Sequence, residues 1–169
     1  MNLKRILIAV DDSEFAAHAA DVGVELAKSL HAEVAFVTVY DPSVGPGRMW
    51  GVPADRLAEM SEHASKRLLA TFWEPTATHS EFVEPGEPAS KIIEVANNWH
   101  ADLIVMGSHG RGKVMGLLLG SVSQGVLHHA PCPVLVVRAR NHERNARHSE
   151  GTIEVRTEMS GRGAEHALR

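Results

Sequence analysis

The chain has 169 residues, of which 44% are hydrophobic and 22% charged, a composition ordinary for one globular domain. Its net charge of −4, without a cluster of Lys and Arg, argues against nucleic acid as a partner. Cys132 is the only cysteine, which excludes an internal disulfide and a cysteine-based metal site. No apolar run approaches the ~20 residues of a membrane span, so we expect a soluble, cytoplasmic protein with no membrane partner.

The N-terminal part of the sequence predicts a β-α-β unit. Residues 3–10 end in a short apolar run typical of a strand, and Ser13 is suited to cap a helix after it. The run 33–40 predicts a second strand. The helix between them is expected to bury a face of apolar residues at helical spacing, namely Phe15, Ala19, Val22, Leu26 and Leu30.

A long loop and a second helix come next. Residues 41–53 contain three prolines and three glycines, and a loop of this length suggests a functional lid. The helix after it is marked by Leu57, Met60, Ala64 and Leu68.

The second half of the domain continues the alternation. Strands are predicted over 78–83, 102–106 and 133–137, with a turn over 84–88 and a short helix over 121–129. Five apolar strands alternating with four helices predict a parallel sheet covered on both faces, a single doubly wound α/β domain. The helix after the turn is expected to bury Ala89, Ile92, Ile93, Ala96 and Trp99.

The composition changes near residue 140. Residues 141–169 hold five Arg, five Glu and three His with few apolar residues. We therefore expect a folded domain over 1–140 and a flexible polar extension over 141–169. The alternating segment 152–156 leaves open the alternative of an added edge strand.

A glycine-rich stretch, GSHGRGKVMGLLLGS, occupies residues 107–121 directly after the fourth predicted strand. Ligands of open α/β sheets bind beyond the carboxyl ends of the strands, where glycine loops expose backbone N–H groups to phosphates. The P-loop pattern fits through Lys113, but Val114 offers no hydroxyl for magnesium. The dinucleotide pattern would need its third glycine at Met115. Both templates are therefore disfavoured.

A third pattern fits without gaps. Gly107-x-x-Gly110, nine residues and then Gly120-Ser121 resemble the G-2x-G-9x-G-[ST] nucleotide loop of the universal stress protein family. Segments 6–13, 86–89 and 130–137 resemble, in order, that family's first strand, third-helix start and final strand. The resemblance covers about residues 1–140. It implies strand order 3-2-1-4-5, ATP as ligand with Mg²⁺ held through the nucleotide, and a homodimer paired through Val134–Val137.

The resemblance also implies a set of nucleotide-binding residues. Asp11 would lie near the ribose and the metal-bound phosphates, with Asp12 as a competing candidate and a turn or capping role as the alternative. Ser121 would either donate to phosphate or cap the last helix. The full set is Ala9, Asp11, Val39, Met106, Gly107, Gly110, Gly120, Ser121 and Val122.

The remaining polar residues carry weaker signals. Arg111 and Lys113 either neutralise phosphate or point into water. His109 is expected to face solvent, with a contact to phosphate as the alternative, and Cys132 is expected to be a buried apolar residue.

No catalytic residue is recognisable, because the sequence offers no Ser-His-Asp pattern, no paired carboxylates and no base for water. We therefore expect a nucleotide-dependent regulator of the stress response with slow or no ATP hydrolysis. One alternative is an interaction module that lacks nucleotide. The other is an ATP-hydrolysing or nucleotidyl-transfer enzyme, which is disfavoured because residues 11–15 contain no glycine.

Overall fold

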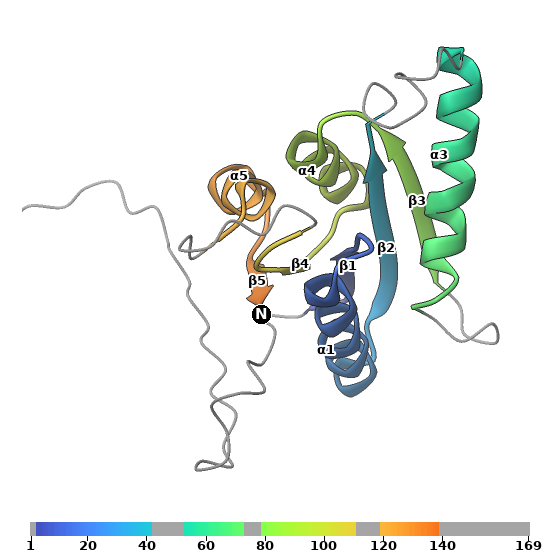
Figure 1. The fold of residues 1–169 in the computed structure, drawn as a ribbon. Coiled ribbons are helices and arrows are strands. Elements are labelled where there is room, and N and C mark those ends of the chain that lie inside the picture. The colour runs from blue at the N-terminus through green and yellow to red at the C-terminus, as the bar shows by residue number, and fades with distance from the viewer. Residues whose placement is uncertain (1–2, 42–52, 73–78, 111–118, 139–169) are drawn as a thin grey trace, which may run out of the picture.

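The computed structural model describes residues 3–41, 53–72, 79–110 and 119–138 (Figure 1). Of the predicted lid over 41–53, only Asp41 and Pro53 are described. Arg111, Lys113 and the whole extension over 141–169 lie outside the described residues, so the predictions made for them remain predictions.

Five parallel strands form one sheet in the order β3-β2-β1-β4-β5, which confirms the predicted fold class and strand order. The chain runs outward from β1 to β3 and then crosses back to β4, so the strand order reverses between β1 and β4. This reversal creates the crevice in which doubly wound proteins bind ligands. The strands are β1 (Arg5–Ala9), β2 (Glu33–Tyr40), β3 (Ser80–Pro85), β4 (Leu103–Gly107) and β5 (Val134–Val137).

Four helices cover the two faces of the sheet (Figure 1). The helices are α1 (Glu14–Leu30), α3 (Ala54–Leu69), α4 (Pro88–Trp99) and α5 (Ser121–His129). Ile6 and Ile8 face the core shared with α1 and α3, whereas Leu7 and Ala9 face the core shared with α4 and α5. This alternation follows from the two-residue period of a strand.

Helix α1 is capped as predicted but buries a different face. Ser13 Oγ accepts a hydrogen bond from Ala16 N–H at 3.2 Å. Leu30 is 44% exposed, and the other large residues of the predicted stripe are only half-buried. A Cβ on Gly23 would lie 2.7 Å from Ile8 Cδ1, so the helix sits too close to the sheet for larger side chains. The residues that are buried are Ala16, Ala19, Ala20, Gly23 and Ala27.

One further prediction needs correction, and one residue that marks a predicted helix lies at the surface. Met60, part of the apolar spacing that predicted α3, is 59% exposed. The third strand continues to Pro85 instead of ending at Val83, because Tyr40 and Pro85 are still in register and Gly86 N–H donates to Tyr40 O at 2.9 Å. Proline is tolerated there because β3 is an edge strand of the described sheet.

The amino ends of β1 and β4 are joined by one carboxylate. Asp102 Oδ2 accepts from the backbone N–H groups of Lys4 at 2.8 Å and Arg5 at 3.0 Å. The Asp102 N–H donates in return to Arg5 O at 2.9 Å. The two central strands are therefore fixed to each other at their starts, while their carboxyl ends lead into loops.

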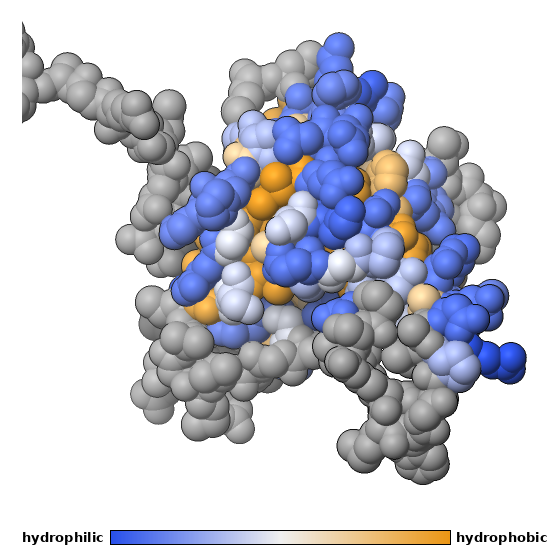
Figure 2. Space-filling view, turned by 90° about the horizontal axis from the view of Figure 1, so that it is seen from above, coloured by the Kyte–Doolittle hydropathy of each residue, from blue (hydrophilic) through white to orange (hydrophobic). Residues whose placement is uncertain are grey.

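The surface over the described residues is mainly hydrophilic. Figure 2 shows hydrophilic side chains over most of the described surface seen from above, with hydrophobic ones in smaller patches between them. Within the described ranges, no helix has the length and apolar character needed to cross a membrane.

Candidate functional site

The two described ends of the glycine loop meet at the carboxyl end of β4. The Gly120 N–H donates to Ser108 O at 2.8 Å. A Cβ built on Gly120 would lie 3.4 Å from His109 Cα and 3.9 Å from Gly110 N. The first and last parts of the predicted phosphate loop are thus adjacent in space, at the point where the strand order reverses.

The three glycine positions of the pattern differ in the room that they would leave for a side chain. A Cβ on Gly107 would lie 2.9 Å from the carbonyl carbon of Phe15, and a Cβ on Gly110 would lie 2.6 Å from Asp11 Oδ2. The contact at Gly107 is with backbone, so packing excludes a side chain there, whereas a side chain at Gly110 would require the Asp11 carboxylate to move. Gly120 has φ −73°, and among the described residues no atom lies closer than 3.4 Å to a built Cβ, so neither its backbone nor its packing against these residues requires glycine.

Gly120 is the N-cap of α5, and within the described part of the chain no side-chain hydrogen bond caps this helix. Ser121 is the first helical residue and is exposed, so the predicted capping role of Ser121 is wrong. The Gly120 carbonyl accepts the first helical bond, from Gln124 N–H at 3.0 Å. An uncapped helix start presents N–H groups and the positive end of the helix dipole, the combination that binds anions in proteins.

Asp11 lies between β1 and α1 and borders the glycine loop. Its Oδ1 accepts from the Ser13 backbone N–H at 3.0 Å and from the Ser13 hydroxyl, while Oδ2 faces Gly110. The turn role weighed for Asp11 is therefore present, and the same bonds fix the carboxylate beside the loop. Asp12, the competing candidate, is exposed. The described residues contain no group of three or more His, Cys, Asp or Glu that could hold a metal ion by itself.

The predicted adenine-lining residues gather on the α4 and α5 side of the sheet. Ala9 and Met106 are register partners on β1 and β4, and they are 7% and 4% exposed. Val39 near the end of β2 and Val122 in α5 are half-buried and pack against the same core. The structure brings these four residues to one side of the carboxyl edge.

His109 and Cys132 are both half-buried side chains near the sheet. His109 is partly exposed, and its ring also lies 5.4 Å from the Phe15 ring centroid with Nδ1 3.2 Å from Ser108 Oγ, so its orientation toward solvent stays a prediction. Burial, with a smaller effect from the Asp102 charge, raises the pKa of the half-buried Cys132 thiol to about 11. A thiol with so high a pKa is a poor nucleophile at neutral pH, which agrees with the expected role.

Ser123 is a site residue that the sequence reasoning missed. It is 2% exposed, and its hydroxyl donates to Gly107 O at 2.9 Å and to Ser108 O at 3.1 Å. The sequence offered one signal for this role. Ser123 lies three residues before Val126, on the same side of the helix, and Val126 is fully buried.

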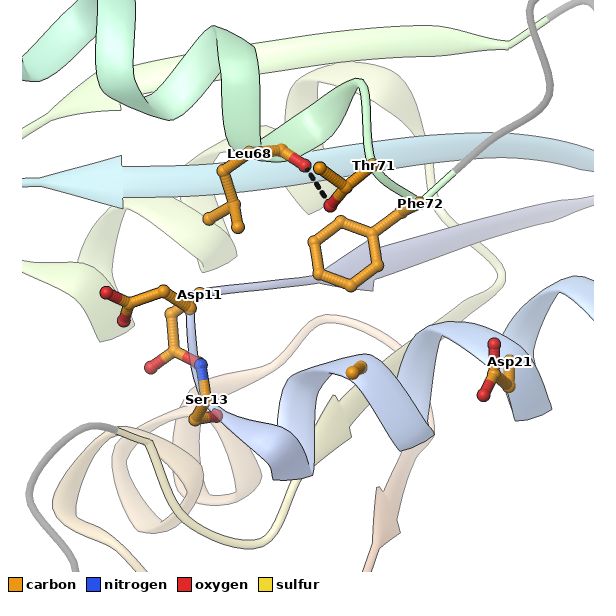
Figure 3. A pocket seen from close by; sticks show the side chains of 8 residues that line it. Asp11, Ser13, Asp21, Leu68, Thr71 and Phe72 are labelled. Carbon is orange, nitrogen blue, oxygen red and sulfur yellow. Dashed lines mark hydrogen bonds between the residues drawn. The ribbon is translucent and has the colours of Figure 1, made fainter.

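A separate pocket of about 330 Å³ lies beside Asp11, between α1 and the end of α3 (Figure 3). In Figure 3 the Phe72 ring points toward α1 and forms part of the pocket wall. Because three of its lining residues are carboxylates, the pocket repels phosphate, and an anion is better accommodated at the glycines. The lining residues are Asp11, Asp12, Ser13, Ala17, Asp21, Leu68, Thr71 and Phe72.

Known proteins resemble both the sequence and the fold. Residues 2–138 match the universal stress protein family. Over 141 residues the chain is 39% identical to a universal stress protein of Methanocaldococcus jannaschii, which covers 80% of this chain and 82% of that protein.

Two solved structures show the same architecture. The protein MJ0577 gives a TM-score of 0.73 at 27% identity, covering 83% of this chain and 99% of its own. A universal stress protein from Archaeoglobus fulgidus, solved in complex with dAMP, gives a TM-score of 0.57 at 22% identity, covering 81% and 99%. By its match over residues 2–138 and its sequence relatives, the chain belongs to the universal stress protein family.

Proposed function

We propose that this protein binds ATP, with Mg²⁺ held through the nucleotide, in the crevice between the carboxyl ends of β1 and β4. The observation that carries the proposal is Gly120. Its backbone and its packing against the described residues both tolerate a side chain, yet the residue is glycine, at a helix start without a side-chain cap among those residues and between the two described ends of the glycine loop. Space and positive polarity at one point are what a phosphate group requires.

Each predicted residue has a place in this arrangement. The phosphates occupy the space beside Gly110 and Gly120, near the exposed Ser121 hydroxyl. Asp11 would repel the phosphates unless a cation lies between them, so we assign it to the ribose and to nucleotide-bound Mg²⁺. The adenine lies against the apolar side formed by Ala9, Val39, Met106 and Val122. The dAMP complex of a relative with the same fold supports an adenine nucleotide as the ligand.

The bound nucleotide acts as a regulatory signal, and its hydrolysis is slow or absent. Hydrolysis needs a group that positions the attacking water. Asp11 is the carboxylate beside the loop, and its Oδ1 is already occupied by both donors of Ser13. We therefore assign the protein to nucleotide-dependent control of a downstream partner in the stress response.

The regulator is a homodimer paired through β5. In the described sheet β5 has only β4 as a neighbour, and its side chains Val134, Leu135 and Val136 are half-buried. Pairing with a second copy would cover this apolar edge, which otherwise invites aggregation. Sedimentation equilibrium should give twice the chain mass of 18.3 kDa. A monomer at micromolar and higher concentrations would refute this assembly.

Isothermal titration of the native protein with ATP and Mg²⁺ tests the nucleotide site. We expect micromolar binding, an intermediate effect of Gly120→Ala and loss of binding in Gly120→Val, because the γ-methyl groups of valine would fill the phosphate space. The alanine variant is the matched control for helix capping, since both substitutions replace the same N-cap residue. Phosphate release measured on the same samples bounds the rate of hydrolysis.

A well-folded native protein that binds no ATP would overturn the proposal. The open apolar edge of β5 would then favour the second candidate function, a dimeric interaction module of the same fold. Rapid phosphate release would instead identify the protein as an enzyme.

A further inference from the structure

We propose that Ser123 is a positioning residue for the phosphates, because its buried hydroxyl turns two carbonyl oxygens away from the place where the anion binds. This inference rests on the proposed nucleotide site and assigns a role to a residue outside the glycine pattern. Ser123 is the third residue of α5 and contacts the turn after β4 from inside the protein.

Three elements fix the backbone of this turn. The Ser123 hydroxyl bonds Gly107 O at 2.9 Å and Ser108 O at 3.1 Å, and the Gly120 N–H bonds Ser108 O at 2.8 Å. The Ser108 N–H donates to Val137 O of β5 at 2.8 Å. Ser108 and Ser123 are both 2% exposed, so water does not compete freely for these bonds.

The direction of these bonds determines which polar groups face the loop. In a planar trans peptide the C=O and N–H groups point in opposite directions. Because the Ser108 carbonyl is held toward α5, the N–H of His109, which belongs to the same peptide, points away from α5. A carbonyl oxygen rotated into the loop would instead place partial negative charge against a phosphate.

This role predicts a loss of affinity that is specific to phosphate. In Ser123→Ala, Gly107 O and Ser108 O each lose the hydroxyl donor. Each of the two peptides then keeps one restraint, Ser108 N–H to Val137 O and Gly120 N–H to Ser108 O, and gains freedom to rotate toward the anion. The adenine side, made of Ala9, Met106 and Val39, is not bonded to Ser123 and keeps its packing. A purely structural serine would lower stability and affect all parts of the ligand alike.

The test compares ATP–Mg²⁺ with adenosine in native protein, Ser123→Ala, Ser123→Thr and Ser65→Ala, by titration and by displacement. Ser65 is a serine of α3 that is 7% exposed and lies away from the carboxyl end of β4, which makes Ser65→Ala the matched control for loss of a buried hydroxyl. We expect Ser123→Ala to bind ATP at least about fivefold more weakly, the equivalent of one net hydrogen bond. Adenosine affinity should change less than twofold, and the threonine and Ser65 variants should bind ATP within about twofold of native.

The outcomes separate this inference from the proposed function. Unchanged ATP affinity in Ser123→Ala, or equal weakening for ATP and adenosine, would overturn the positioning role and leave the nucleotide site standing. A threonine variant as weak as the alanine variant would also count against the hydroxyl. If the native protein binds neither ligand, the proposed function fails, and the role of Ser123 fails with it.

Discussion

Replacing Gly107 by alanine should destabilise the protein even without nucleotide. The new Cβ would lie 2.9 Å from the carbonyl carbon and from the Cβ of Phe15 and 3.0 Å from the Phe15 oxygen, whereas ordinary contacts begin near 3.4 Å. These are mostly backbone atoms in the first turn of α1, so no side-chain rotation relieves the contact. Overpacking of this kind costs about 1–3 kcal/mol, and the lower entropy of the unfolded chain offsets about 0.4–1 kcal/mol. We expect a net loss of about 1.5 kcal/mol.

Urea unfolding of nucleotide-free protein measures this loss. With a slope of about 2 kcal/mol per molar urea, the midpoint of Gly107→Ala should fall by about 0.7 M. Gly120→Ala is the matched control, because its Cβ meets no atom of the described residues closer than 3.4 Å and its φ of −73° suits alanine. Its free energy of unfolding should stay within about 0.5 kcal/mol of native. Equal losses in the two variants would refute the distinction between a packing glycine and a ligand glycine.

Two further predictions concern ionisable groups. The side-chain and backbone hydrogen bonds from Ser90, with a smaller one from Ala89 N–H, lower the pKa of Glu87, the N-cap of α4, below its ordinary 4.5. Its contribution to stability is therefore complete above pH 4.5 and is lost as the pH falls through the lower folded pKa. The difference in unfolding free energy between native and Glu87→Gln, from urea titrations at several pH values, should shrink over that acid range, and a constant difference would contradict this cause. Because the pKa of the Cys132 thiol is raised from 9.0 to about 11, alkylation at pH 8 should be about a hundredfold slower in folded than in urea-unfolded protein, and equal rates would show that the thiolate is not disfavoured.

The sequence allowed the fold to be predicted more fully than its packing. Apolar runs and glycine or proline breaks located all five strands, and the resemblance supplied their order. The buried face of α1 was predicted wrongly because large apolar residues were assumed to mark it. The distance between helix and sheet decides that face, and the contact of Gly23 with Ile8 shows that only small residues fit there. Periodicity carries no information about that distance.

The sequence likewise predicted some features of the candidate site and not others. The glycines were found because a pattern with fixed spacing carries them, and Asp11 because residues 6–13 resemble the first strand of the family; the structure places Asp11 beside Gly110. Whether Gly120 or Ser121 caps α5 depends on one residue of helix boundary, which sequence patterns do not resolve. Ser123 was missed because its partners are backbone carbonyls across the turn, and no residue type marks a carbonyl that needs a donor.

The bonds between Asp102 and the start of β1 have a consequence for synthesis of the chain on the ribosome. Strand β1 is made almost a hundred residues before β4, the strand on one of its two sides. At a translation rate of 5–20 residues per second, the side of β1 that pairs with β4 stays unpaired for roughly 5–20 s. Throughout this interval a nascent chain carries a largely apolar strand with one unpaired side, and the backbone N–H groups of Lys4 and Arg5 lack the Asp102 carboxylate that later accepts from them. The sheet is therefore completed only after β4 has been translated. A chain that stops before β4 exposes one side of β1, the strand that lies at the centre of the finished sheet.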